Sequence, residues 1–434
     1  MPDFNEIKTK ADDFRKAKNY AVALPLYENL WKNFKKQCSK WDGWGYAFCL
    51  QKLEKYQEAL NVCREVYPSN KDFEQIKSVY GWCIYYTEIK VDKVDDENKF
   101  LKAANGILQL SNQEDNYSPY TNTALKVLDY FDKKNLYNAK KILEWTSKIN
   151  PDLLSTDPFS FTDSQKKKRE NASPKEKYFS HLINALFENE QYKNCIELCN
   201  TALNSIPKFH YKNEIWFKRK IAQSKFNLNQ YDEALLIYEE IIKREKDWFI
   251  QKEIADIYFI QNKFDEALKY SVEAALNVGE DNMKVELFKL LAMILSKKGK
   301  TIEAKKHIEF AYIVKQENEH KIKDDFIALV NSYKIDTNKL KNYREQLNEM
   351  RNIWQMLKFG KQEIFEGRVK KILPDGKSGF ISGDNGKDFF FSFKNFIGNG
   401  KLLVQGLRVS FFLEDSFDKK KNLATKIAVN IKTI

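Results

Sequence analysis

The sequence has few of the residues and motifs on which most enzyme and metal sites depend. It contains only four histidines and six cysteines in 434 residues, and it has no Gly-x-x-x-x-Gly-Lys-Ser/Thr phosphate loop, no His-Glu-x-x-His and no Gly-x-Ser-x-Gly. The cysteines lack paired Cys-x-x-Cys spacing, so we expect buried, reduced thiols. The sequence therefore predicts no catalytic site, no metal site and no cofactor, and a protein that is not an enzyme.

Long apolar runs are also missing. No segment approaches the roughly 18 uninterrupted apolar residues of a membrane span, and the first residues, "MPDFNEIKTKADDF", contain no apolar run typical of a signal peptide. We therefore expect a cytoplasmic protein with no membrane partner. The four histidines (His181, His210, His307 and His320) are spread along helical patterns, and we expect "HIEF" and "ENEH" to be solvated helix positions.

Aromatic, apolar and charged residues are all plentiful. They make up 14%, 43% and 31% of the chain, which excludes wholesale disorder, and the length predicts several domains or a repeat array. Lysine and arginine number 73 against 61 acidic residues. The excess is concentrated from Glu366 onward, where 13 basic residues stand against 7 acidic ones. Such a balance favours a polyanionic partner for the C-terminal part.

One pattern recurs along most of the chain. In "KYQEALNVCREVYP", "QYKNCIELCNTALNSIP", "QYDEALLIYEEII" and "KFDEALKYSVEAA", an aromatic residue is followed three positions later by a small one and then by apolar residues at helical spacing. Successive small residues of this kind are 33 to 56 positions apart, as expected for a repeat of about 34 residues with insertions. They are Ala23, Ala59, Ala103, Ala139, Cys195, Ala234, Ala267 and Ala304.

Further small residues keep the same register. Twelve positions upstream stand Ala11, Ala47, Ala222, Ala255 and Ala292, and seven positions downstream stand Ala202, Ala274 and Ala311. This pattern resembles the tetratricopeptide repeat (TPR) family, and the resemblance implies a superhelical solenoid of about eight helix pairs over residues 1–318, with a concave groove that binds a protein or peptide. The match is weaker in the third and fourth units, and residues 152–174 form an insertion that we expect at the surface.

Two features of the repeats leave alternatives open. The run Lys166-Lys167-Lys168-Arg169 in the insertion is either a second phosphate contact or a solvated loop. The tryptophans at helical positions are expected to pack between helices, with one or two able to line the concave face. They are Trp44, Trp82, Trp145, Trp216 and Trp248.

Residues 319–360 differ from the repeats in their pattern. Their apolar positions have helical spacing, and the segment ends at Gly360. We expect one or two helices that cap the last repeat and connect it to the C-terminal region.

The last part of the chain, residues 361–434, changes to the periodicity of strands. Five short runs, "IFEGRVKKIL", "SGFIS", "DFFFSF", "LRVSFFLED" and "LATKIAVNI", are separated by polar turns such as "PDGK" and "GDNGKD". Five strands in this length predict a small closed all-β barrel. The fold class is thus multidomain, with an all-α solenoid followed by a five-stranded barrel.

The motifs in these strands resemble those of the cold-shock domain, an OB-fold barrel that binds single-stranded RNA or DNA. "GRVK" matches the first strand, "GKSGFI" the first RNP motif and "FFFSF" the second. Carried over by position, the resemblance implies base stacking by Phe380, Phe390 and Phe393. It implies phosphate contacts by nearby lysines, which are Lys370, Lys371, Lys377, Lys387 and Lys394.

Three positions depart from the cold-shock pattern. Lys371 stands where the family has a tryptophan, Ser378 replaces an aromatic residue and Ser392 replaces a histidine. We therefore carry two functions forward. In the first, the protein is a cytoplasmic adaptor whose solenoid binds a protein while its barrel binds single-stranded RNA or DNA. In the second, the barrel has lost nucleic-acid binding and the whole chain is a protein-binding scaffold.

Overall fold

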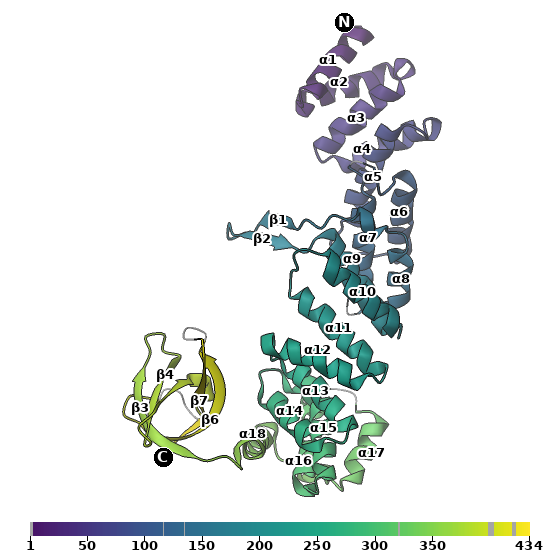
Figure 1. Ribbon diagram of the computed structural model, residues 1–434. Coiled ribbons are helices and arrows are strands. Elements are labelled where there is room, and N and C mark those ends of the chain that lie inside the picture. The colour runs from purple at the N-terminus through teal and green to yellow at the C-terminus, as the bar shows by residue number, and fades with distance from the viewer. Residues whose placement is uncertain (1–2, 116, 134, 320–321, 398–402, 419–421) are drawn as a thin grey trace. The chain divides into compact units, whose positions relative to one another are not determined.

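The computed structural model describes residues 3–115, 117–133, 135–319, 322–397, 403–418 and 422–434. This part of the chain holds 18 α-helices, a two-stranded hairpin after the eighth helix, and five C-terminal strands (Figure 1). The helices are α1 (Phe4–Lys16), α2 (Tyr20–Asn33), α3 (Lys40–Lys52), α4 (Tyr56–Val66), α5 (Glu74–Ile84), α6 (Glu97–Leu110), α7 (Tyr120–Phe131), α8 (Ala139–Thr146), α9 (Pro174–Glu188), α10 (Tyr192–Ser205), α11 (Asn213–Asn227), α12 (Tyr231–Arg244), α13 (Trp248–Ile260), α14 (Phe264–Leu276), α15 (Val285–Lys297), α16 (Thr301–Glu317), α17 (Asp324–Ser332) and α18 (Tyr343–Phe359).

The chain divides into two compact units, Met1–Ile237 and Tyr238–Ile434. The first unit contains α1 to α11, and the second contains α13 to α18 together with the five C-terminal strands. The boundaries predicted from the sequence, at residues 318 and 360, stay predictions. The predicted fold class is confirmed, since TPR-like helix pairs are followed by a closed five-stranded barrel.

The helices α1 to α16 form eight successive pairs, and six of the pairs share one turn. The turn residue has a positive φ in each case, at Lys18, Glu54, Glu190, Asn229, Asn262 and Gly299. A left-handed residue after a helix lets the next N–H groups bond the last carbonyls, and the N–H of Lys55 indeed donates to the oxygen of Leu50 at 2.9 Å. Each of these residues lies five positions before the small residue that marks the following helix.

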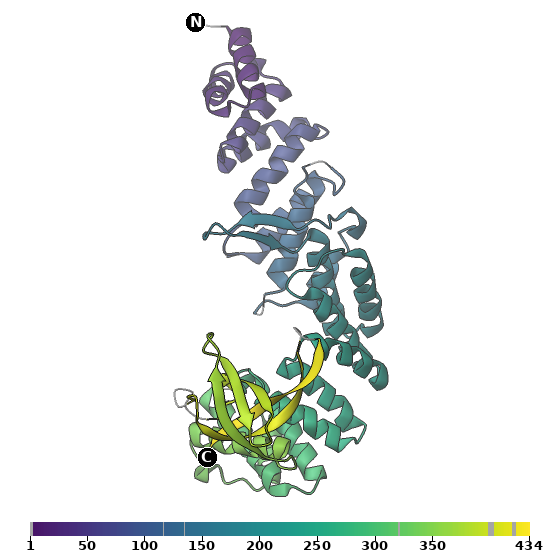
Figure 2. The ribbon, with the colours of Figure 1, turned by 60° about the vertical axis from the view of Figure 1, so that its left-hand side comes forward.

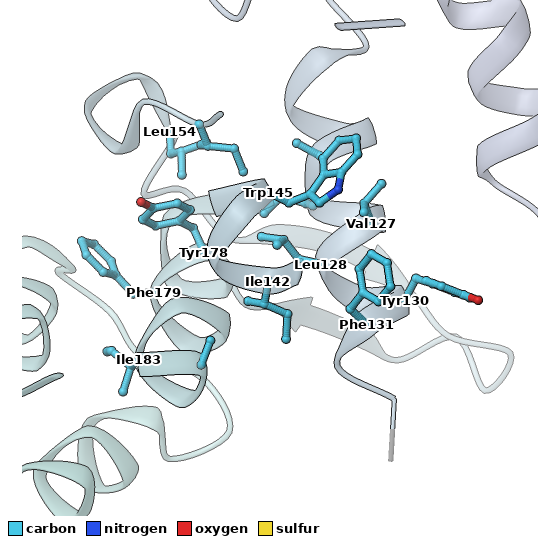
Figure 3. Close-up of a cluster of buried hydrophobic side chains, with 14 of the residues drawn as sticks. Val127, Leu128, Tyr130, Phe131, Ile142, Trp145, Leu154, Tyr178, Phe179 and Ile183 are labelled. Atoms are coloured by element: carbon cyan, nitrogen blue, oxygen red, sulfur yellow. The ribbon is translucent and has the colours of Figure 1, made fainter. Parts of the chain in front are cut away.

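The small residues lie where the helices cross. Ala23, Ala59, Cys195, Ala234, Ala267 and Ala304 are fully buried, as are the upstream alanines Ala11, Ala47, Ala222, Ala255 and Ala292. In the third pair the buried position belongs to Ala104 instead of Ala103, so the predicted marker is off by one residue. Larger side chains fill the space between the crossings, as the cluster around Trp145, Leu128 and Phe179 illustrates (Figure 3).

The insertion between α8 and α9 folds into a hairpin. Strands β1 (Phe159–Thr162) and β2 (Lys168–Asn171) pair antiparallel, with Phe159 opposite Asn171 and Phe161 opposite Arg169. The hairpin projects from the helices of the first unit in both ribbon views (Figures 1 and 2). The surface position agrees with expectation, whereas the strands were not predicted.

The predicted capping segment forms α17 and α18, and α18 corrects one expectation. Trp354 of α18 is 1% exposed and packs against Phe288 and Phe310 of the last repeat. Its Nε1 donates to Nε2 of His307 at 2.9 Å, and His307 is fully buried. The prediction that "HIEF" is a solvated position was therefore wrong. His320, in "ENEH", lies outside the described residues.

The five C-terminal strands close into a barrel. They are β3 (Phe365–Ile372), β4 (Ser378–Gly383), β5 (Asp388–Ser392), β6 (Arg408–Asp418) and β7 (Leu423–Thr433). The order around the barrel is β3-β4-β5-β7-β6, and pairing between β3 and β6 closes it. The β5–β7 pair is parallel and the other four are antiparallel.

Candidate nucleic-acid interface

The outer face of strands β4 and β5 carries two of the predicted stacking residues side by side. Phe380 pairs directly with Phe390 across the two strands. Their ring centroids lie 5.7 Å apart with the planes at 75°, an edge-to-face contact. Phe390 is 37% exposed, whereas its neighbours Phe389 and Phe391 are 7% and 0% exposed. Strand alternation thus turns the middle of three consecutive phenylalanines outward.

Gly379 of β4 has no side chain and leaves room for the ring of Phe391 in the barrel core. A Cβ at Gly379 would lie 2.5 Å from the carbonyl oxygen of Lys371 and 2.7 Å from the ring of Phe391. A side chain at this position would therefore displace the ring that fills the barrel. The cold-shock motif that "GKSGFI" resembles has glycine here, and in this chain Phe391 occupies the space that a side chain would take.

Strand β3 adds a cation to the phenylalanine pair. A bulge between Val369 and Lys371 shifts the register, so that Lys371 lies opposite Phe380. The Nζ of Lys371 lies 5.4 Å from the centroid of the Phe380 ring, within the range of a cation–π contact. The lysine at the family's tryptophan position thus contacts the platform that the tryptophan would have joined.

The third predicted stacking residue, Phe393, has a different environment. It begins the short 3₁₀ turn Phe393–Asn395, and its ring stacks on the core residue Phe391 with centroids 5.8 Å apart and planes at 12°. The ring is half-buried and packs against the barrel core. Its N–H donates to the oxygen of Lys377 at 2.9 Å, which fixes the turn to the start of β4.

The five predicted lysines are all exposed, but they do not offer equal charge. Lys370 forms an ion pair with Asp388 at 2.5 Å, and its hydrogen bond lowers the pKa of that carboxyl. The other four form no ion pair with a carboxylate among the described residues. They are Lys371, Lys377, Lys387 and Lys394. The charges of these four lysines are thus available to an anionic ligand. Lys370 attracts phosphate less, because the carboxylate of Asp388 partly neutralises its charge.

The two serines that depart from the family pattern have local structural partners. Ser378 is 8% exposed and donates from Oγ to the carboxylate of Asp375 at 3.0 Å. The N–H of Lys377 and this hydroxyl together lower the pKa of Asp375. Ser392 accepts from the N–H of Lys394 at 3.4 Å and caps the 3₁₀ turn. Neither serine contributes a stacking surface.

Lys394 also lies at a cleft of about 870 Å³ beside the barrel, within the second unit. Residues of α18 line the other side, and they include Arg351 and Lys358. Lys358 pairs with Glu414 of β6 at 2.5 Å, and Phe359 stacks on Phe412 with centroids 4.9 Å apart. Helix α18 is therefore fixed to the barrel by an ion pair and a ring contact.

The tryptophans singled out in the repeats divide into two groups. Trp145 is 1% exposed and belongs to the core. Trp44, Trp82, Trp216 and Trp248 are half-buried. Another tryptophan, Trp41, was not singled out from the sequence; it is 50% exposed and contacts the ring of Trp44 edge-to-face. Its position at the start of α3, before the regular apolar pattern begins, is why the sequence did not single it out.

The buried histidines and cysteines have structural partners. His181 is 7% exposed; its Nε2 hydrogen-bonds Oδ1 of Asp129 at 3.0 Å, and its Nδ1 lies 3.5 Å from the carboxylate of Asp132. Burial opposes its protonation, but the two carboxylates outweigh burial and raise the pKa of His181 to about 9. All six cysteines are free thiols, and all but Cys38 are buried. Within the described residues, no group of three or more potential ligands is placed to hold a metal ion.

A search for membrane spans gives a negative result. None of the helices in the described part of the chain combines the length and the apolar character needed to cross a membrane.

Comparison with known proteins adds little beyond this geometry. Residues 215–351 match the model of a family described as a domain of unknown function, DUF7017. No curated protein matches. Among solved structures, MamA AMB-1 is 12% identical with a TM-score of 0.33, covering 46% of this chain and 98% of its own. The human IFIT1 dimer with m7Gppp-AAAA is 12% identical with a TM-score of 0.37, covering 81% of this chain and 80% of its own. At these TM-scores the likeness carries no argument about function.

Proposed function

We propose that this chain is a non-enzymatic, cytoplasmic adaptor whose C-terminal barrel binds single-stranded RNA or DNA and whose helical repeats bind a protein partner. The observation that carries the proposal is the outward Phe380–Phe390 pair with Lys371 beside it. Exposed aromatic rings stack on bases of any sequence, and nearby cations attract the phosphates. The resemblance of "GKSGFI" and "FFFSF" to cold-shock motifs supports the same ligand.

The proposed adaptor would bring its two ligands close together. A nucleic acid held by the barrel and a protein held by the repeats are attached to one chain, so each raises the effective concentration of the other. No new contact between the two ligands is needed for this effect. The protein partner is proposed from the repeat architecture alone, since paired helices of this kind build extended binding surfaces.

The test is a fluorescence-anisotropy titration of a labelled single-stranded RNA or DNA, about 12 nucleotides long, since an OB fold covers roughly 4–16 nucleotides. The full chain is compared with the double variant Phe380→Ala/Phe390→Ala. Loss of base stacking, worth about 1–3 kcal/mol per ring, should weaken binding by about 5- to 150-fold per ring. Phe417→Ala is the matched control, because Phe417 is an exposed phenylalanine (55%) of strand β6 in the same barrel.

Salt dependence separates phosphate contacts from stacking. If all four unpaired lysines contact phosphates, the logarithm of the affinity should fall with the logarithm of salt concentration with a slope of about −3, at about −0.7 per contact. Lys371→Ala should make the slope shallower by about 0.7. Unchanged affinity in the phenylalanine double variant would reject the barrel face as the site.

A second function, a purely protein-binding scaffold, is favoured by other observations on the same face. Lys370 is paired with Asp388, and where the cold-shock motifs have an aromatic residue and a histidine this chain has Ser378, which bonds Asp375, and Ser392, which caps the 3₁₀ turn. Under this alternative the full chain binds no oligonucleotide at any salt concentration. A complete absence of binding would therefore replace the first proposal with the second.

A further inference from the structure

The hairpin β1–β2 belongs to no helix pair and exposes an unusual amount of apolar surface. Phe159 is 66% exposed and Phe161 is 38% exposed. The two residues are separated by one position on β1, so both rings lie on the same face of the hairpin. Their centroids are 6.5 Å apart and their planes are inclined by only 16°. Two near-parallel rings are thus presented to solvent.

The tip and second strand of the hairpin are strongly basic. Lys166, Lys167, Lys168 and Arg169 are consecutive and exposed. Only Arg169 has an ion-pair partner among the described residues, Asp163 at 3.0 Å. Asp163 also accepts from the N–H groups of Gln165 and Lys167, so this carboxylate holds the turn together. Three lysines therefore keep their charge available: Lys166 and Lys167 at the turn, and Lys168 opposite Thr162, on the other face of the hairpin from the rings.

The base of the hairpin is anchored. Glu170 pairs with Lys208, and its carboxylate lies 3.5 Å from Nε2 of His210. The hydroxyl of Tyr211 donates to Oδ1 of Asn171 at 2.7 Å. An isolated two-stranded hairpin is marginally stable in water, so these contacts supply the support that a larger sheet would give.

A buried carboxylate fixes the segment to which the hairpin is tied. Glu176, at the start of α9, is fully buried and accepts from the N–H of His210 at 2.7 Å and from its Nδ1 at 2.9 Å. Asn213 donates to the same carboxylate at 2.8 Å. The residues 208–213 are thereby held in place, and Tyr211, which is 62% exposed, adds a third aromatic ring near the base of the hairpin.

We propose that the β1–β2 hairpin is a second binding site for single-stranded nucleic acid, separate from the barrel. Near-parallel rings serve as platforms for bases, and adjacent lysines attract the phosphates. The two ring centroids are only 6.5 Å apart, so neighbouring bases of one strand can lie against both rings. The charge of the tip selects a polyanion over an uncharged apolar partner. The proposal goes beyond the proposed function of the barrel and does not depend on it.

The experiment titrates labelled single-stranded RNA and DNA with the full chain carrying Phe380→Ala/Phe390→Ala, so that the barrel's contribution is reduced. Adding Phe159→Ser/Phe161→Ser should weaken the remaining binding by at least about 5-fold per ring, the lower end of the range for base stacking. Adding Lys166→Ser/Lys167→Ser/Lys168→Ser should make the salt slope shallower by about 2, at about 0.7 per lysine. These side chains are exposed, and an unchanged thermal-unfolding curve checks that each variant is folded.

Charge-matched variants supply the control. Lys16→Ser/Lys36→Ser/Lys71→Ser removes the same charge from exposed lysines elsewhere in the first unit. If this control lowers affinity as much as the hairpin lysine variant, the effect is general electrostatics and the proposal fails. It also fails if the hairpin variants leave oligonucleotide binding unchanged. Binding to vesicles that contain phosphatidylserine is measured with the same variants, and the proposal fails if only vesicle binding is reduced.

The variants also distinguish failure of the hairpin proposal from failure of the barrel proposal. Full loss of binding in the hairpin variants with no effect of Phe380→Ala/Phe390→Ala would contradict the proposed function of the barrel and keep the hairpin site. The converse result would keep the barrel and reject the hairpin.

Discussion

The last helical repeats and the barrel belong to the same compact unit, and both bury large rings, but the repeats also bury small residues where their helices cross. In α13 to α16, small residues such as Ala255, Ala267 and Ala304 are fully buried where helices cross. In the barrel, the large rings of Phe391 and Phe411 are fully buried, and a glycine, Gly379, makes room for one of them. The repeats depend on close approach of backbones, whereas the barrel depends on filling a fixed volume.

This difference also decides where aromatic side chains reach the surface. A helix turns its apolar residues to one stripe, so repeat aromatics such as Phe288 and Phe310 face the interior, while Trp41, at 50%, is exposed. A strand alternates, so a run of three phenylalanines must place one outside. Phe390 is that residue, and the β-bulge in β3 places Lys371 opposite its cross-strand partner, Phe380. The geometry of the barrel therefore places two phenylalanines and a lysine together on its outer face.

The largest expected effect is the removal of volume from the barrel core. Phe391→Ala should lower the free energy of unfolding of the barrel by about 3–5 kcal/mol, because a fully buried ring is lost and the cavity remains. Hydrogen exchange of the β4 and β5 amides should accelerate accordingly. Phe417→Ala, on an exposed residue, should leave exchange nearly unchanged. Equal protection in both variants would contradict the account of the core.

The next largest effect is a dependence of stability on pH, caused by the buried His307 in the last repeat. Burial lowers the pKa of His307 to about 4, below the ordinary value of 6.5. Because the unfolded chain binds a proton below pH 6.5 and the folded chain does not, stability should fall as the pH drops from about 6.5 toward 4. The full loss is roughly 3 kcal/mol, at about 1.4 kcal/mol per pKa unit. Thermal unfolding of the wild type and His307→Gln at pH 8, 6.5 and 5 measures it.

A histidine of the first unit provides the control for this pH dependence. The pKa of His181 is raised to about 9, so its stabilisation is complete below pH 6.5 and is lost as the pH rises through 9. His181→Asn should remove a loss of stability on the alkaline side, while His307→Gln should remove one on the acidic side. Identical pH profiles for both variants would show that these environments are wrongly assigned.

The smallest expected effect is the addition of volume to a helix crossing. Ala304→Leu should destabilise the second unit by about 1–3 kcal/mol, because the position is fully buried between packed helices. Urea unfolding followed by tryptophan fluorescence measures the change. Ile302→Leu, two positions away at a side chain that is 71% exposed, should have little effect. Tolerance of leucine at position 304 would mean that the crossing is less close than described.

The repeats could be predicted because their packing leaves a local trace. Small residues twelve positions apart mark where two helices of a pair meet, and the spacing survives changes at most other positions. The left-handed turn residue five positions before each marker was available as a further signal, but it was missed because lysine, glutamate and asparagine occupy it as well as glycine. The strands of the barrel were predicted from alternation and polar turns.

Features made by distant contacts could not be predicted in this way. His307 is buried because Trp354, 47 residues away, packs on it, and nothing in "HIEF" records that contact. The hairpin strands are only four residues long, too short for a periodicity to be recognised. The unequal availability of the five barrel lysines likewise depends on a cross-strand partner, since Lys370 and Asp388 are 18 residues apart.

The measurement that tests the central claim most directly is ultraviolet cross-linking of a bound single-stranded RNA to the full chain, with the attached residues identified by mass spectrometry. The account predicts cross-links on Phe380 and Phe390 of the barrel face, because bases stacked on those rings lie within bonding distance of them. The Phe380→Ala/Phe390→Ala chain should lose these cross-links. Attachment confined to α1–α16, with none between residues 378 and 394, would contradict the claim that the barrel is a nucleic-acid site.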